Sequence, residues 1–430
     1  MGQLLRGARL FSPGDGLDEK RDILLEDGRI ARIGEIDPKG HDLIELKGLV
    51  LMPGFIDLHA HLREPGEEYK ETIETGTLSA KRGGYTTVVC MPNTRPPIDD
   101  PEGVRFVIKK AKEAGHAKVL PAGAITKGRE GRELAEMGLM AAEGAAMFTD
   151  DGSWVFSSSV MRRAMEYASA IGRTIASHPE DRSLSGNACA HEGPLSVKLG
   201  FETAPREAED IAVSRDIFLS GLTGARLHLQ HISSTGSVEL VRRAKDVGLP
   251  VTAEVTPHHL LFTYEALESY DTVYKVNPPL REEKDRDALL AALSDGTLDA
   301  IATDHAPHSP FDKEYEFPLA ASGMIWLEMA FSALYTFLVL PGKISLERLV
   351  ESLTTGPAGV LGLDDLGRIR EGAVADLVAW DLGKEWEVRG LASLSRNTPL
   401  LGKVLKAKPE RIWVDGKDGK DGKDGNEKEF

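Results

Sequence analysis

The middle of the chain alternates between short apolar runs and longer segments of mixed polarity. Each apolar run has the length of a buried strand, and the segment after it is long enough for a helix. Eight such runs end in polar residues, at 55–61, 86–93, 118–126, 145–151, 174–180, 226–233, 250–258 and 299–308. Eight strand–helix units over about 300 residues predict an α/β fold of the (β/α)₈ TIM-barrel type. A doubly wound sheet is the alternative, but no glycine-rich dinucleotide fingerprint follows the first run.

The two ends of the chain have a different, strand-like pattern. Residues 23–33 form two β-like runs around Asp27-Gly28, a dipeptide typical of a hairpin turn. Further β-like runs lie at 373–381 and 411–416. We therefore predict the following division: a small β-sandwich from both termini, 1–52 plus 363–415; a barrel, 53–362; and a disordered tail, 416–430. The tail begins with Gly-Lys-Asp repeats that offer no apolar side chain to bury.

Composition narrows the function classes. The formal net charge of −16 opposes non-specific binding to nucleic acid or to anionic membranes, but it allows a small anionic ligand that meets local cations. The most apolar segment, 324–340, contains Glu328 and is short for a membrane span. Only two cysteines are present, Cys90 and Cys189, which suits a reducing compartment. We expect a cytoplasmic protein with neither nucleic acid nor a membrane as its partner.

Histidines and carboxylates gather at the ends of the predicted strands. In chain order these residues are His59, His61, Asp150, Asp151, His178, His231 and Asp304. The first two lie two positions apart, so their side chains point to the same face of a strand. The carboxyl ends of barrel strands converge on one mouth, where these groups would meet. Imidazole and carboxylate ligands together suit borderline divalent ions, zinc first, with manganese or cobalt as alternatives.

Two neighbouring cations would require an anion between them, because they repel strongly. Some barrels use a carboxylated lysine from the fourth strand, but the run at 145–149 has no lysine. The bridge must then be a carboxylate from Asp150 or Asp151. Neighbours on an extended chain face opposite ways, so one of the two serves, and the pattern leaves open which.

Six motifs, taken as an ordered set, resemble the long, bacterial-type dihydroorotases of the amidohydrolase superfamily. The motifs are His-Ala-His-Leu-Arg at 59–63, Met-Pro-Asn-Thr at 91–94, Phe-Thr-Asp-Asp-Gly at 148–152, Val-Thr-Pro-His-His-Leu at 255–260, Val-Asn-Pro-Pro-Leu-Arg at 276–281 and Ala-Thr-Asp-His-Ala-Pro-His at 302–308. The resemblance covers residues 1 to about 415.

The resemblance implies a binuclear zinc centre and a set of substrate contacts. The implied ligands are His59, His61 and Asp304 for one ion, His178 and His231 for the other, and Asp151 as the bridge. The implied substrate contacts are Arg63, Asn93, Asn277 and His308. We also expect the backbone near Ser322 and Gly323 to contact the substrate. At this point, however, the chain reads Ala-Ala-Ser-Gly, where relatives carry a Pro-Phe-Gly-like stretch.

The implied reaction is the reversible closure of N-carbamoyl-L-aspartate to dihydroorotate in pyrimidine synthesis. In the hydrolytic direction a metal-bridging hydroxide attacks the ring amide, and Asp304 carries the proton to the leaving nitrogen. Arg63 offers a planar fork of donors for the substrate carboxylate. The structural alternative for Arg63 is a surface ion pair with Glu64 or Glu67, and for Asn277 it is a turn before the next proline.

Three other functions compete with this interpretation. A hydantoinase or allantoinase would share the barrel and the metals. A non-catalytic subunit that only scaffolds an aspartate carbamoyltransferase would be expected to lack metal ligands, and none is missing here. A sugar-phosphate enzyme would need a glycine-rich phosphate loop after strands seven and eight, where this chain has histidines and Asp304. A homo-oligomer and a complex with aspartate carbamoyltransferase stay open.

The remaining histidines receive structural interpretations. His258 and His259 are expected behind the ligands, and His228 is expected to point elsewhere. His41, His116 and His191 are expected at the surface.

Overall fold

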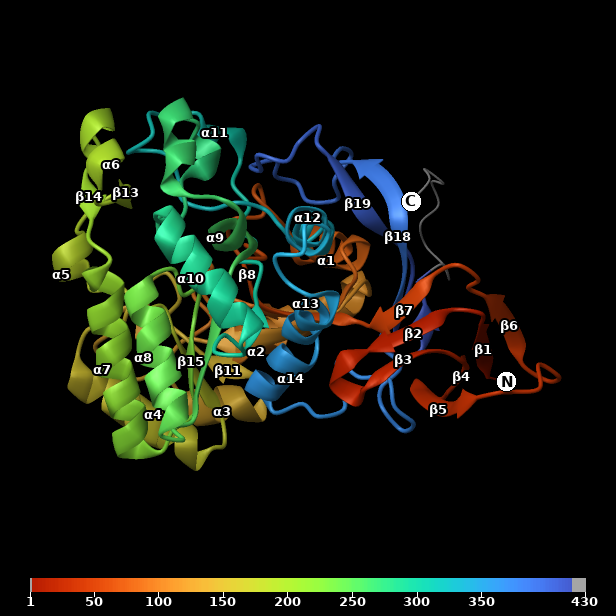
Figure 1. Ribbon diagram of the computed structural model, residues 1–430. Helices are drawn as coiled ribbons and strands as arrows, with labels where there is room; N and C mark the ends of the chain where they lie inside the picture. Colours follow the sequence, from red (N-terminus) through yellow and green to blue (C-terminus); the bar gives the residue numbers. More distant parts are fainter. Residues whose placement is uncertain (1, 420–430) are drawn as a thin grey trace.

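The computed structural model describes residues 2–419 of the chain. Its centre is a parallel eight-stranded sheet in which neighbours follow chain order (Figure 1). The strands are β8 (Phe55–Ala60), β9 (Tyr85–Cys90), β10 (Lys118–Gly123), β11 (Met147–Phe148), β12 (Thr174–Ser177), β15 (Leu227–Leu229), β16 (Val251–Val255) and β17 (Ala300–Ile301). A bridge between Ala60 and His305 joins the first strand to the last. Each predicted run overlaps one strand, and the predicted barrel is confirmed.

Helices cover the outside of the barrel, so the strands are buried on both faces. The covering helices are α1 (Ile73–Arg82), α2 (Pro101–Ala114), α3 (Met137–Ala142), α4 (Ser158–Ala170), α7 (Glu207–Thr223), α8 (Thr235–Asp246), α10 (Glu283–Ser294), α13 (Leu346–Leu353) and α14 (Thr355–Leu361). Side-chain caps start several of them: Asp100 accepts from the Gly103 amide and Ser234 from the Ser237 amide.

Longer connections follow three of the strands. After β12 come α5 (Arg182–Ser185), β13 (Ala190–His191), α6 (Pro194–Leu199) and β14 (Thr203–Ala204). After β16 come α9 (Pro257–Leu261), η3 (Tyr264–Ser269) and η4 (Thr272–Tyr274). After β17 come α11 (Pro310–Lys313), α12 (Ala330–Leu334) and the π-helical turn η5 (Tyr335–Val339). No helix among residues 2–419 is long and apolar enough to cross a membrane.

The two ends of the chain form two further sheets. One has the order β5-β4-β1-β6, and the other has the order β20-β19-β18-β7-β2-β3. Their strands are β1 (Gln3–Arg6), β2 (Arg9–Ser12), β3 (Leu17–Lys20), β4 (Asp22–Glu26), β5 (Arg29–Gly34), β6 (Asp42–Glu45), β7 (Val50–Pro53), β18 (Leu377–Glu387), β19 (Val404–Val414) and β20 (Lys417–Asp418). The short helical turn η1 (Pro13–Asp15) links β2 to β3.

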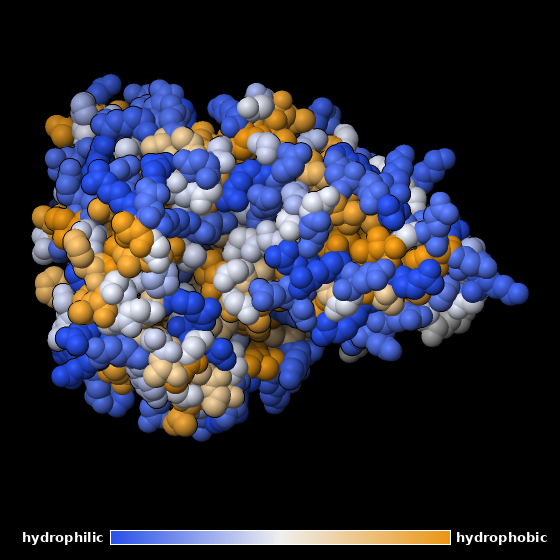
Figure 2. Space-filling model, turned by 60° about the horizontal axis from the view of Figure 1, so that its bottom comes forward, coloured by the Kyte–Doolittle hydropathy of each residue, from blue (hydrophilic) through white to orange (hydrophobic). Residues whose placement is uncertain are grey.

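One apolar core holds these terminal sheets together. Leu5 and Ile23 from the first strands pack in the same cluster as Leu377 and Trp413 from the last ones. The predicted hairpin is present, since Asp27 and the glycine after it both have positive φ angles between β4 and β5. The terminal sheets extend to one side of the barrel in Figure 1, and Figure 2 shows the same narrow projection beside the broad body. The composite sandwich is confirmed as part of the fold, whereas its exact boundaries stay predictions.

The predicted start of the disordered tail is wrong. Lys417 and Asp418 form β20, which pairs with the end of β19. Asp418 is buried and accepts hydrogen bonds from Arg411, so the carboxylate and the guanidinium compensate each other there. A charged sequence is thus ordered by a neighbouring strand that the sequence pattern does not reveal. The rest of the predicted tail, 420–430, lies outside the described residues.

Candidate metal centre

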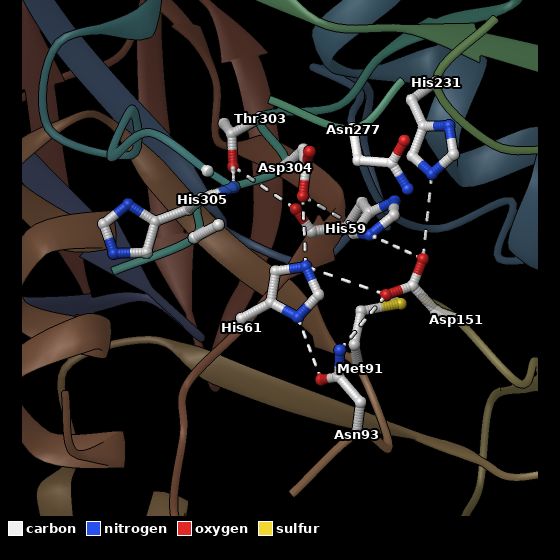
Figure 3. A network of polar contacts seen from close by, with 12 residues as sticks. His59, His61, Met91, Asn93, Asp151, His231, Asn277, Thr303, Asp304 and His305 are labelled. Carbon is white, nitrogen blue, oxygen red and sulfur yellow. Dashed lines mark hydrogen bonds and ion pairs between the residues drawn. The ribbon is translucent and has the colours of Figure 1, made fainter. Parts of the chain in front are cut away.

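The first two candidate ligands lie at the end of β8. His59 is fully buried, and its Nε2 lies 3.2 Å from Oδ1 of Asp151. Nε2 of His61 lies 3.0 Å from Oδ1 of Asp304, which follows β17. Both imidazoles therefore face the same group of carboxylates, as their spacing along one strand predicts (Figure 3).

The second pair of imidazoles approaches the same carboxylate from the opposite strands. Nδ1 of His178, after β12, and Nε2 of His231, after β15, lie 3.5 and 3.7 Å from Oδ1 of Asp151. Asp150 turns away instead, because it accepts hydrogen bonds from the backbone amides of Ile125 and Thr126. Of the two neighbouring aspartates, the structure thus places Asp151 between the imidazole pairs.

These donors fit divalent metal ions. Candidate ligand atoms lie within 4.8 Å of one another in each of two groups, and Asp151 belongs to both: His59, His61 and Asp151 form one, and Asp151, His178 and His231 the other. Nε2 of His231 and Nδ1 of His178 face each other at 2.9 Å, which suits a shared cation. Nε2 of His59 is buried without a hydrogen-bond partner among the described residues. Nitrogen and oxygen donors in this mixture suit zinc best among common ions.

Charges within the cluster stabilise one another. Burial disfavours ionisation of Asp151, but the charge of His59 and hydrogen bonds from His178 and His231 outweigh it and hold the pKa of the carboxyl well below its usual value. Burial also opposes protonation of His178, yet Asp151 and Glu180 raise its pKa to about 9. Metal binding would therefore replace protons on these imidazoles.

A buried carboxylate behind the ligands escaped the sequence analysis. Glu254 on β16 is fully buried, and its Oε1 lies 2.9 Å from Nδ1 of His59. Its other oxygen lies 2.9 Å from Nε2 of His228, which points to Glu254 and belongs to none of the candidate ligand groups among the described residues. Burial by itself raises the pKa of Glu254, but hydrogen bonds from these two imidazoles outweigh that effect and lower the pKa to about 2. The carboxylate fixes the orientation of His59, so that Nε2 faces Asp151.

One cavity of about 810 Å³ opens onto this cluster. Its lining includes all six predicted substrate contacts, namely Arg63, Asn93, Asn277, His308, Ser322 and Gly323. It also includes all the candidate ligands except His59, namely His61, Asp151, His178, His231 and Asp304. The structure therefore brings the predicted substrate side chains and the candidate metal ligands to a single space.

Arg63 is buried and directed toward the segment 307–323 that follows β17, here called the mouth segment. Its Nε donates to the carbonyl oxygen of Pro307 at 3.2 Å, and Nη2 lies 3.3 Å from Nε2 of His308. The alternative of an ion pair with Glu64 or Glu67 is not what the described residues show, since these carboxylates pair with lysines. The guanidinium is therefore a buried cation beside the cavity.

Two asparagines lie on opposite sides of the cluster. Oδ1 of Asn93 accepts a hydrogen bond from Nδ1 of His61 at 2.9 Å. Nδ2 of Asn277 donates to Oε2 of Glu180 at 3.2 Å and lies beside His178. Asn277 thus reaches the cavity even though it precedes a proline, so the turn alternative does not account for its side chain.

The mouth segment, 307–323, closes one side of the cavity. Nε2 of His308 donates to the carbonyl oxygen of Ser322 at 2.8 Å. Gly323 has a φ of 139°, and a Cβ there would lie 2.5 Å from the Cβ of Ala306. This position therefore requires glycine for both conformation and space.

The surface prediction for His191 is wrong. It is 1% exposed and lies between Arg206 and Arg281, each within 3.3 Å of one ring nitrogen. Burial, and then the two guanidinium charges, lower its pKa to about 4. The reason is the connection after β12, whose small two-stranded sheet buries it.

Comparisons with known proteins agree with this geometry. The model of the Dihydro-orotase-like family matches residues 48–237, and that of the Amidohydrolase family matches 220–417. Dihydroorotase of Geobacter sp. (strain M21) is 45% identical over 97% of this chain and 99% of its own length. Dihydroorotase of Anaeromyxobacter dehalogenans (strain 2CP-1) is 46% identical over 96% of each chain.

The fold has relatives among solved structures. L-Hydantoinase from Arthrobacter aurescens superposes with a TM-score of 0.87 at 26% identity, over 97% of this chain and 96% of that one. The curated relatives cover nearly the whole chain at much higher identity than this structure does. The chain belongs to the dihydroorotase family of the amidohydrolases.

Proposed function

We propose that this protein catalyses the reversible cyclisation of N-carbamoyl-L-aspartate to (S)-dihydroorotate and water, a step of pyrimidine synthesis. The observation that carries the proposal is a buried Arg63 facing the same cavity as the imidazole–aspartate cluster. A cavity that contains both a cation and a metal-binding cluster suits a small substrate whose carboxylate meets the cation and whose amide lies at the cluster. Full-length relatives named dihydroorotase support the same reaction.

We assign two zinc ions to the cluster. His59, His61 and Asp304 would hold one, His178 and His231 the other, and Asp151 would contact both. Bound zinc would lower the pKa of water and polarise the amide carbonyl.

The side chains of this chain supply binding and proton transfer. Arg63 binds the substrate carboxylate, and Asn93, Asn277 and His308 offer further polar contacts around the ring. In hydrolysis, Asp304 accepts the proton of the attacking water and delivers it to the ring nitrogen as the C–N bond breaks. In cyclisation the same carboxylate takes the proton from the attacking nitrogen and gives it to the departing oxygen.

The charge of Arg63 separates this reaction from hydantoin hydrolysis. A hydantoin ring is neutral and leaves a buried guanidinium without a counter-charge, which is unfavourable. Dihydroorotate carries a carboxylate that compensates it. The complete ligand set argues in turn against a purely scaffolding subunit.

The test is metal analysis combined with assays of the isolated chain on dihydroorotate and on hydantoin. We expect about two zinc ions per chain and turnover of dihydroorotate in preference to hydantoin. His61→Ala should lose zinc and activity, whereas His41→Ala, in the loop before β6, should keep both. A zinc-loaded wild type that hydrolyses hydantoin and leaves dihydroorotate intact refutes the proposal.

The reaction also has a characteristic pH dependence. Carbamoyl-aspartate has two carboxylates and dihydroorotate one, so ring closure consumes a proton. The equilibrium ratio of ring to open form should rise about tenfold for each unit by which the pH falls. A ratio that does not change between about pH 6 and 8 would mean that another reaction takes place.

Assembly is a separate proposal. We propose that the chain forms a homo-oligomer and associates with aspartate carbamoyltransferase, as the family resemblance suggests. Light scattering of the protein alone and mixed with that enzyme measures both masses. A monomer whose mass is unchanged in the mixture contradicts both parts.

A further inference from the structure

Two lysines hold the backbone of the mouth segment beside the cavity. Nζ of Lys275 donates to the carbonyl oxygens of Pro318 at 2.8 Å and Ala320 at 2.6 Å. Nζ of Lys313 donates to those of Ala321 at 2.8 Å and Gly323 at 3.2 Å. Four carbonyl groups within 318–323 are thus bound by two ammonium groups.

The position of these lysines is electrostatically unfavourable. Each is 8% exposed, and among the described residues neither forms an ion pair with a carboxylate. Burial, and then the charge of Lys275, lower the pKa of Lys313 to about 7, although Asp271 and Asp312 oppose this. Buried charges are usually paired, so backbone dipoles here take the place of counter-ions.

The bonds of Lys275 connect the mouth segment to a second loop. Its own carbonyl oxygen accepts from the amide of Gly323 at 2.8 Å, and its side chain binds two carbonyls of the same segment. Lys275 also lies two positions before Asn277, and both residues line the cavity. The mouth segment is therefore held in register with a loop that contributes a proposed substrate contact.

We propose that Lys275 and Lys313 are positioning residues that fix the backbone of 318–323 for substrate binding. With its neighbouring carbonyls bound by the lysines and its own carbonyl bound by His308, Ser322 is held at the cavity wall. The lysines thereby order the backbone of 318–323 before the substrate binds, so that binding does not have to supply the free energy of ordering it. The substrate named in this proposal rests on the proposed function.

The test compares Lys275→Met and Lys313→Met with Lys343→Met, a control at an exposed lysine after η5. Methionine keeps a long flexible chain and removes the ammonium. We expect KM for dihydroorotate to rise about tenfold or more in the first two variants, while kcat stays within about threefold and zinc content is unchanged. Lys343→Met should resemble the wild type.

A second readout separates positioning from simple destabilisation. Destabilisation lowers the folded fraction, which reduces apparent kcat and leaves KM unchanged. Positioning predicts faster amide hydrogen exchange within 314–323 of the ligand-free protein in both lysine variants, and not in the control. KM within twofold of wild type, together with unchanged exchange, overturns the proposal.

A further variant allows for a Lys313→Met protein that does not fold, and the exchange measurement separates failure of the lysine proposal from failure of the proposed function. Lys313→Gln keeps a neutral donor and should show a smaller rise in KM than Lys313→Met, and it replaces that variant if the latter does not fold. A zinc-loaded wild type without dihydroorotase activity would refute the proposed function alone, because the exchange measurement tests the lysines without substrate.

Discussion

The base of the metal centre and the mouth segment above it are built in opposite ways. At the base, side chains from different barrel strands bind one another, as in the fully buried line from His59 on β8 through Glu254 on β16 to His228 on β15. At the mouth, the groups held in place are backbone carbonyls, and the side chains that hold them come partly from other segments, such as Lys275 and Asn397, and partly from the mouth segment itself, such as Lys313. On the proposed function, we therefore expect changes at the base to affect the chemistry and changes at the mouth to affect substrate affinity.

The largest expected effect lies at the base. Asp304→Asn keeps the shape of the side chain but removes the proton acceptor, so kcat should fall by about 10²–10⁴. Asp287→Asn, at an exposed site on α10, is the matched control. The measurement is kcat at saturating dihydroorotate, with zinc content and the melting temperature recorded alongside. A loss below about tenfold would remove Asp304 from its role.

A smaller effect is expected one layer further from the substrate. Glu254→Gln removes the charge that orients His59, and zinc affinity should fall by about 10–100-fold. KM measured at saturating zinc should change little, because Glu254 does not line the cavity. Competition with a chelator gives the affinity, and Glu283→Gln at an exposed site is the control. Unchanged affinity would show that His59 is oriented without the carboxylate.

At the mouth the expected pattern is reversed. Gly323→Ala places a methyl group against Ala306 at an unfavourable φ, so the backbone must shift. KM should rise about tenfold, with zinc affinity unchanged. Gly342→Ala is the control, since Gly342 also has a positive φ but no atom near its missing Cβ. If Gly323→Ala lost zinc and kept a normal KM, the proposed division, in which the mouth affects KM and the base affects zinc affinity, would be contradicted.

The smallest expected effect concerns coupling between the two regions. In the double variant Glu254→Gln/Gly323→Ala, the changes in zinc affinity and KM should add, with a coupling energy below about 0.5 kcal/mol. Zinc titrations and kinetics of the two single variants and the double variant give this value. A coupling above about 1 kcal/mol would mean that base and mouth respond as one unit.

The sequence reveals the base better than the mouth. His59 and His61 could be found because a repeated spacing on one strand has a direct geometric meaning. Glu254 has no such partner in sequence, yet an acid inside the apolar run of β16 is a signal that could have been used. Lys275 and Lys313 look like surface lysines, because their burial depends on loops that meet only in three dimensions.

Burial by segments that are distant in the sequence also explains the two wrong predictions. The sequence pattern predicts a surface position for His191 because the segment that buries it has no strong periodicity of its own. The sequence pattern predicts a disordered tail at Asp418 because the pairing of β20 with β19 is a tertiary contact that the pattern does not contain. In both cases the local pattern correctly shows that the residue is polar, but it does not show which distant segments pack against that residue.

The composite sandwich has a consequence for the order in which the molecule is made. During synthesis on the ribosome, β2 and β7 emerge early, but β18, which pairs with the other edge of β7, emerges only after the whole barrel. Asn397, which binds the backbone of Ala306 and Gly323, follows β18 and emerges among the last described residues. A nascent chain that ends before it would carry every candidate metal ligand and an incomplete mouth, so we expect substrate affinity to be the last property that translation confers.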